Sequence, residues 1–173
     1  IRGDRTQNIE DAIAAYKQVL QVETRESLPS KWALTINNLA HAYVDRIRGD
    51  QAQNIEDAIA TFEQALQVIT QESTPVDWAS LMHNLADAYV KRIRGDRAQN
   101  IEDAIAVYEK ALQVKTREAM PVDWALTMNN LAQAYTERIR GDRAQNLEDA
   151  IAAYKQVLQV RTQEAMPVDW ALV

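Results

Sequence analysis

The stretch HNLADAYVKRIRGDRAQNIEDAIAVY, residues 83–108, decides the fold of this chain. On both sides of Gly95 its apolar residues recur every three or four positions, which fits the 3.6-residue period of an α-helix and not the two-residue period of a strand. Glycine ends helices in a left-handed turn without steric cost, and asparagine is a strong N-cap. The stretch therefore predicts two helices joined by a tight turn, with Gly95 closing the first and Asn100 capping the second.

The turn contains Arg94-Gly95-Asp96, a tripeptide that is often interpreted as a cell-adhesion signal. Adhesion requires it at the tip of a mobile extracellular loop, and nothing in the sequence marks an extracellular protein, so we interpret it as a joint between two helices. Two arginines flank each joint. They either pair with the acidic starts of the second helices or form a basic edge for a second partner. These arginines are Arg46, Arg48, Arg92, Arg94, Arg138 and Arg140.

The same stretch recurs along the chain at intervals of 46 residues, and every glycine, proline and tryptophan follows this interval. These residues are Gly3, Gly49, Gly95 and Gly141; Pro29, Pro75, Pro121 and Pro167; and Trp32, Trp78, Trp124 and Trp170. The chain of 173 residues is therefore a single repeat array, with units at 1–46, 47–92 and 93–138 and a partial unit at 139–173. We expect it to be a piece of a longer array.

Each unit is expected to supply two amphipathic helices. One is predicted over 54–72, with Asn54 as its N-cap and Asp57 in a position that resembles a capping box. The other is predicted over 75–93, with Pro75 in its first turn and Thr74 as its cap. Trp78 begins the apolar stripe of this helix, which favours a core position over a ligand platform. Neither helix can bury its stripe alone, so the units must stack and share one core.

Two motifs resemble the tetratricopeptide repeat, namely Leu85-Ala86-x-x-Tyr89 and Ala58-x-x-x-Phe62-x-x-Ala65-Leu66, which is followed by Pro75. The resemblance covers the whole chain. It implies an all-α solenoid of antiparallel helix pairs, stacked in a right-handed superhelix, with the 75–93 type of helix lining the concave side. The unit is longer than the family's usual length of about 34 residues, with extra residues between the helices and after the 54–72 helix. A HEAT-type solenoid is the alternative architecture.

Composition argues against several classes of function. The chain has no cysteine, two histidines in different units and no phosphate-binding or dinucleotide glycine pattern, so we expect neither an enzyme nor a metal or cofactor site. A net charge of −6 and a pI near 5.0 disfavour nucleic acid, whose affinity comes mostly from neutralised phosphates. No apolar run approaches the roughly 20 residues that span a bilayer. We expect a cytoplasmic protein without a membrane partner.

The units are nearly identical, so the positions at which they differ carry information. Three variable columns, spaced by four residues, form one ridge on the 75–93 type of helix, and the resemblance places this ridge on the concave face. The columns are Asn37, His83 and Asn129; His41, Asp87 and Gln133; and Asp45, Lys91 and Glu137. Beside them runs a column of asparagines, Asn38, Asn84 and Asn130.

In relatives, an asparagine at the matching place hydrogen-bonds the backbone of an extended peptide. The four columns either bind such a peptide, or form an unselected polar surface on which the asparagines tie adjacent helices together. The ridge offers only Lys91 against Asp45, Asp87 and Glu137, which disfavours acidic C-terminal tails as ligands.

The leading hypothesis is a non-enzymatic scaffold that binds a protein or an extended peptide. One alternative is a sensor or regulatory arm of a larger signalling protein, for example one with a caspase-like peptidase or a nucleotide-binding switch. Another is a structural or engineered array without a ligand. Neither end of the array carries a polar capping helix, so we also expect head-to-tail stacking between copies.

Overall fold

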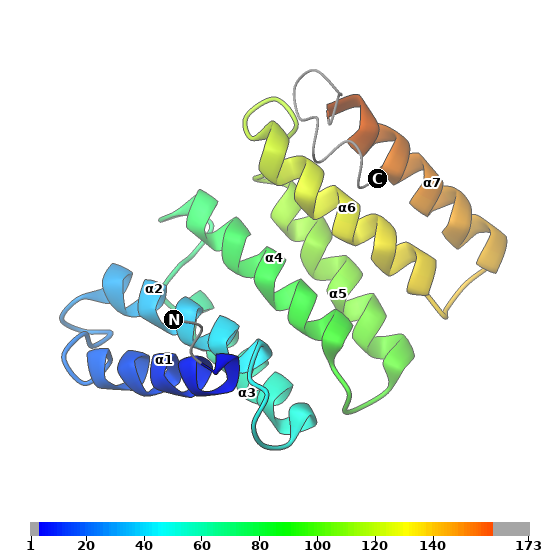
Figure 1. The fold of residues 1–173 in the computed structure, drawn as a ribbon. Coiled ribbons are helices and arrows are strands. Elements are labelled where there is room, and N and C mark those ends of the chain that lie inside the picture. Colours follow the sequence, from blue (N-terminus) through cyan, green and yellow to red (C-terminus); the bar gives the residue numbers. More distant parts are fainter. Residues whose placement is uncertain (1–3, 161–173) are drawn as a thin grey trace.

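The computed structural model describes residues 4–160, which form seven α-helices and, within this range, no strand. They are α1 (Arg5–Val19), α2 (Pro29–Val44), α3 (Gln51–Leu66), α4 (Pro75–Lys91), α5 (Arg97–Leu112), α6 (Pro121–Glu137) and α7 (Arg143–Val160). Each helix packs on the next, so the helices follow one another through the structure in chain order from α1 to α7 (Figure 1). The predicted all-α solenoid is confirmed. Pro167 and Trp170 of the fourth unit lie outside the described residues.

The helices form two layers, which we call the A helices (α2, α4 and α6) and the B helices (α1, α3, α5 and α7). Phe62 of α3 and Tyr108 of α5 occupy the same position in successive units, and both are buried in the core. Ala58 of α3 is fully buried as well, which lets neighbouring helices approach closely. Trp124 is buried and Trp78 packs half-buried against the core, so the predicted core role of the tryptophans is confirmed for these two residues.

The joint between an A helix and the next B helix turns at a glycine. Gly95 has a φ of +82°, a left-handed conformation that residues with a Cβ rarely adopt. The next residue, Asp96, is the N-cap of α5, and its carboxylate accepts a hydrogen bond from the Ala98 amide at 3.0 Å. The B helices therefore begin earlier than predicted. The expectation that Asn100 caps α5 is wrong, and so is the same expectation for Asn54 in α3, where Asp50 is the cap.

Asn100 instead lies inside the first turns of α5, only 2% exposed, and holds the joint together from within. Its Nδ2 donates hydrogen bonds to the carbonyl oxygens of Arg94 at 2.9 Å and Arg92 at 3.4 Å. Asn54 and Asn146 make the matching pair of bonds in their own joints. Carbonyl groups at and just beyond the end of a helix have no partner within the helix, and the asparagine supplies one.

The A helices begin as predicted but end differently. Pro75 is the first residue of α4, where its missing N–H is not needed. Thr74 occupies the N-cap position but makes no side-chain capping bond, and its buried hydroxyl oxygen has no partner among the described residues, so the predicted cap is wrong. The helix ends at Lys91, and Ile93 is exposed beyond it. Gly95 therefore turns the chain after the helix has ended, rather than closing it.

The inner arginine of each joint pairs with the B helix that precedes it. Arg92 donates from Nε to Glu56 Oε1 at 2.8 Å and from Nη2 to Oε2 at 2.7 Å, and this hydrogen bonding lowers the pKa of Glu56. The pairs Arg46–Glu10 and Arg138–Glu102 repeat the arrangement. The outer arginine, Arg94, donates to Gln53 Oε1 at 2.8 Å. Of the two interpretations of these arginines, pairing with the start of a B helix is confirmed for these residues.

The buried amide of the joint yields a stability prediction. The substitution Asn100→Ala removes a buried amide that bonds two carbonyl oxygens of the joint, so we expect the free energy of unfolding to fall by about 1–3 kcal/mol. Urea denaturation followed by circular dichroism measures this change. The matched control is Gln99→Ala, since Gln99 is exposed and, among the described residues, its side chain bonds to Asp103 on the same helix. We expect a loss within about 0.5 kcal/mol for the control, and equal losses in the two variants would contradict the role of the joint.

Candidate functional site

The A helices of successive units contact one another. α2 contacts α4 and α4 contacts α6 directly, whereas successive B helices are held together mainly through the A helices between them. In a curved stack of helices, the layer whose members approach one another most closely lies on the inside. The four columns predicted from the sequence lie on these A helices, except that Asp45 is the C-cap of α2. We call the surface of the A helices that faces away from the B helices the inner face.

The asparagine column ties neighbouring A helices together. Asn84 Nδ2 donates to Asn37 Oδ1 at 3.1 Å, and Asn130 Nδ2 donates to Asp87 Oδ1 at 3.0 Å. All three members of the column, including Asn38, are half-buried. The structure therefore contains the helix-tying bonds of the second interpretation at two junctions.

Asp87 is the centre of a polar network between α4, α5 and α6. Besides the bond from Asn130, its Oδ1 accepts a hydrogen bond from the Tyr108 hydroxyl, and its Oδ2 lies 3.6 Å from His83 Nε2. His83 is 7% exposed, and its Nδ1 lies 3.0 Å from Thr127 Oγ1. Thr127 Oγ1 also lies 2.9 Å from the carbonyl oxygen of Asp123, to which it donates a hydrogen bond. Asp87 and His83, which were predicted to contact a ligand, thus bond to residues of the neighbouring helices.

The remaining variable positions differ in how far they reach solvent. His41, Gln133, Asp45 and Lys91 are exposed, whereas Asn37, Asn129 and Glu137 are half-buried. Glu137 forms an ion pair with Arg97. His41 sets the edge of its ring against Phe62, with the ring centroids 5.4 Å apart. The exposed members are therefore the ones available to a partner.

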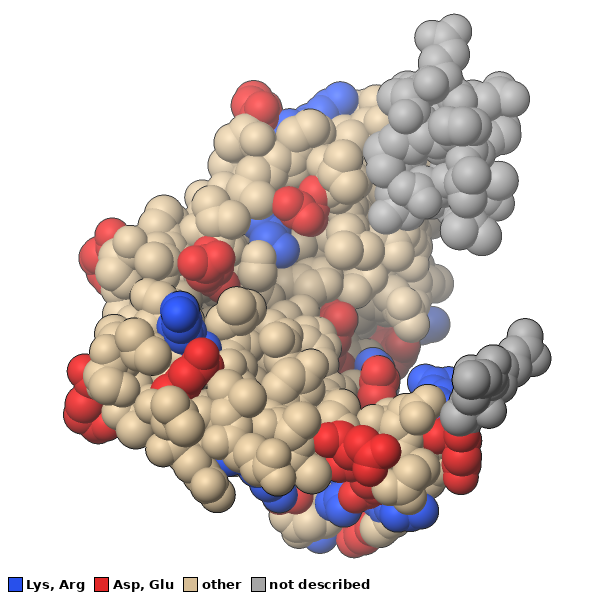
Figure 2. Space-filling view, turned by 60° about the vertical axis from the view of Figure 1, so that its left-hand side comes forward, with Lys and Arg blue, Asp and Glu red and all other residues tan. Residues whose placement is uncertain are grey.

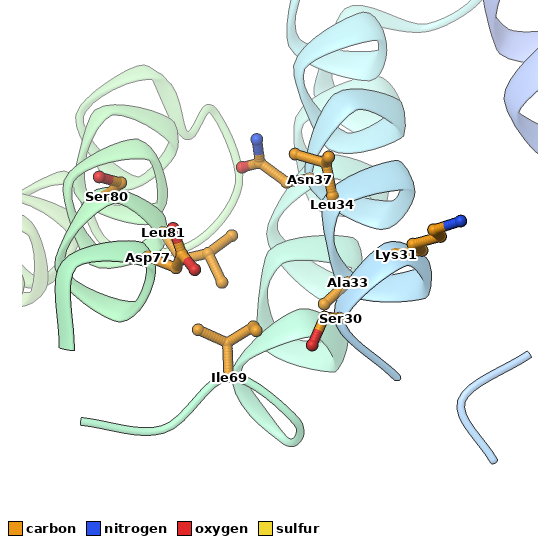
Figure 3. Close-up of a pocket in the computed structure, with 9 residues that line it drawn as sticks. All are labelled: Ser30, Lys31, Ala33, Leu34, Asn37, Ile69, Asp77, Ser80 and Leu81. Carbon is orange, nitrogen blue, oxygen red and sulfur yellow. The ribbon is translucent and has the colours of Figure 1, made fainter. Parts of the chain in front are cut away.

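Two hollows open between the A helices. The larger, of about 400 Å³, lies between α2 and α4, with Ile69 at its base and Leu34, Asn37, Asp77 and Leu81 among its walls (Figure 3). The second, of about 270 Å³, is bounded by α4, α5 and α6. Its lining includes four residues that the sequence columns had predicted, namely Asp87, Lys91, Asn130 and Gln133. The structure brings these four together at one junction.

Sequence reasoning missed a column at the end of the B helices. Its described members are Glu23, Ile69 and Lys115. Glu23 accepts a hydrogen bond from Thr35 Oγ1 at 2.8 Å, Ile69 is buried at the base of the larger hollow, and Lys115 is only 4% exposed. Burial lowers the pKa of Lys115, and the nearby carboxylates of Asp123 and Asp87 oppose that shift. The signal that could have revealed this column is the difference in residue type at one position of near-identical units, which is an acid in one unit, an aliphatic residue in the next and a base in the third.

The surface chemistry shows no continuous basic field on the side drawn in Figure 2, where acidic and basic side chains are interspersed. Within residues 4–160, no group of three or more histidine, aspartate or glutamate side chains is placed to hold a metal ion. No helix in the described part of the chain is long and apolar enough to cross a bilayer.

A family model, described as tetratricopeptide repeat, matches residues 32–70, 78–116 and 124–164, which together make up more than half of the chain. Each match begins at a tryptophan of an A helix and runs through the following B helix. A comparison with curated proteins finds no match.

The two histidines predict a pH dependence of stability. Burial lowers the pKa of His83, and also that of His41, below the ordinary value of 6.5, although Asp87 opposes the shift at both. The unfolded chain therefore binds protons more readily, so the free energy of unfolding should fall as the pH drops from about 7 through 6.5. Thermal unfolding at a series of pH values measures this decline.

His83→Asn is the variant of choice, because asparagine occupies the matching positions 37 and 129. It should reduce the decline in stability between about pH 7 and 5.5, and the double variant His41→Asn/His83→Asn should abolish it, since the chain has no other histidine. A double variant that kept the full wild-type decline would show that other groups are responsible.

Proposed function

Because the chain belongs to the tetratricopeptide-repeat family, we propose that it is a non-enzymatic scaffold that binds an extended segment of a partner protein along the inner face. The observation that carries this proposal is the pair of hollows at successive junctions of the A helices, both lined by residues of these helices. One lies between α2 and α4, and the other involves α4 and α6.

The dimensions of the array suit an extended chain. An extended peptide advances about 3.3 Å per residue. A segment that runs across the A helices would therefore bring side chains several residues apart to successive junctions. Successive junctions differ in the residues that they present, so the order of side chains along the segment would set which partner binds.

Rigidity of the inner face supports recognition without a conformational change. The bonds from Asn84 and Asn130 fix the spacing of the A helices, and the network at Asp87 fixes the junction of α4 with α6. A preorganised surface loses little conformational entropy when it binds, so more of the contact energy appears as affinity. The residues that differ between units and reach solvent, such as His41 and Gln133, are left to select the partner.

A display experiment tests this function. A library of random dodecapeptides is selected on the immobilised chain, and the enriched peptides are measured against the variant His41→Ala/Lys91→Ala/Gln133→Ala by isothermal titration calorimetry. All three residues are exposed on A helices, and we expect the affinity to fall about tenfold or more, which corresponds to about 1.4 kcal/mol.

The matched control changes three exposed residues of the B helices, as Gln64→Ala/Lys110→Ala/Gln156→Ala, and should leave the affinity within about twofold. Circular dichroism verifies that both variants fold. Failure to enrich any peptide over an unrelated protein would contradict the proposed function, as would a loss of binding confined to the control variant.

A further inference from the structure

The hollow between α2 and α4 combines apolar walls with one carboxylate. Ile69 lies at its base, and Leu34 and Leu81 face it from the two A helices (Figure 3). Asp77, in the first turn of α4, stands at its edge and forms no ion pair with the described residues. Lys31 of α2 is also at the edge, but its side chain extends away from the opening (Figure 3). The carboxylate of Asp77 therefore has no basic side chain of the described residues beside it in the hollow.

The next junction shows what the same place in the fold can hold. One unit along, the residue that matches Ile69 is Lys115, which lies just after α5 and is only 4% exposed. The residue that matches Asp77 is Asp123, and its carboxylate acts on the Lys115 ammonium group together with that of Asp87. This protein thus already accommodates a lysine side chain at one A-helix junction, beside the carboxylate at the start of an A helix.

The α2–α4 junction has the matching acid, Asp77, but no lysine at the matching position. Ile69 stands at the position of Lys115, and Leu81 at the position of Thr127. The residues at the base of the hollow are therefore apolar, and the Ile69 side chain is shorter than that of lysine. The volume of about 400 Å³ remains open where the matching lysine would extend. His41 stands where Asp87 stands in the next unit, which leaves Asp77 as the main carboxylate for a bound cation.

We propose that this hollow binds a lysine side chain of the partner segment, with the aliphatic stem against Leu34, Ile69 and Leu81 and the ammonium group directed to the Asp77 carboxylate. The inference rests on the proposed function, because the lysine is carried by the extended segment on the inner face. A methylene stem gains from apolar burial while its charged end stays near an acid and solvent. The net charge of −6 also favours the approach of a basic segment.

The peptides selected from the dodecapeptide library test the inference directly. We expect a lysine to be enriched at one position. In the tightest peptide, replacing that lysine by norleucine keeps the stem and removes the charge, and should weaken binding about tenfold, while glutamate should abolish it. Replacement by arginine reports whether the hollow selects the compact ammonium group or any cation, and we expect weaker binding.

Three protein variants locate the lysine. Asp77→Asn should weaken binding of the lysine peptide about five- to tenfold and leave the norleucine peptide unchanged. Ile69→Lys/Leu81→Thr recreates the occupied junction found at Lys115 and Thr127, and should abolish binding by filling the hollow from within. The control, Glu118→Gln, alters an exposed carboxylate outside the hollow and should have no effect.

The outcomes separate the two proposals. Enriched peptides without a preferred lysine, or a lysine peptide whose binding ignores both Asp77→Asn and Ile69→Lys/Leu81→Thr, would overturn the lysine site while the scaffold function stands. An absence of any enriched peptide would refute the scaffold function, and the lysine site would fall with it. If the double variant fails to fold, the charge-selective effect of Asp77→Asn still decides the question.

Discussion

One buried amide at each joint is the interaction on which the rest of this solenoid depends. Asn100 donates hydrogen bonds to the carbonyl oxygen of Arg92, the C-cap of α4, and to that of Arg94, which directly precedes the left-handed turn at Gly95. The chain can therefore reverse direction in a few residues without burying unsatisfied polar groups. The reversal sets an A helix against a B helix in every unit. The paired arginine at the same joint then fastens it to the preceding B helix, for example Arg92 to Glu56.

This construction divides the sequence into two classes of residue. The residues that build the joints and the core are repeated almost without change, because every unit must present the same surface to its neighbours. The inner face does not carry that constraint, and the units differ there. At the α2–α4 junction the variable residues leave an apolar hollow with an acid, and at the α4–α6 junction they form a network around Asp87 and a buried lysine. The two junctions are therefore chemically distinct sites on one frame.

Most of the fold could be predicted from the sequence, because period, proline and glycine locate the helices. The start of the B helices could not be, since Asp96 and Asn100 are both favoured N-caps and only the packed structure shows which side chain turns inward. Variable columns could be found by comparing units. The bond from Asn84 to Asn37 could not, because it joins residues 47 apart through the stacking of two units. The burial of Lys115 likewise contradicts the usual exposure of lysine.

The central claim is that the repeated core and joints hold chemically different junctions on the inner face, and that a partner protein binds at these junctions. Amide chemical shifts of the ¹⁵N-labelled chain, recorded during titration with a selected peptide, test it most directly. The account predicts that the largest shifts fall on the inner face at the α2–α4 junction, at residues such as Asn37, Ser80 and Leu81, with little change on the exposed sides of α3 and α5. Shifts concentrated at exposed B-helix positions such as Gln64 and Lys110 would contradict it.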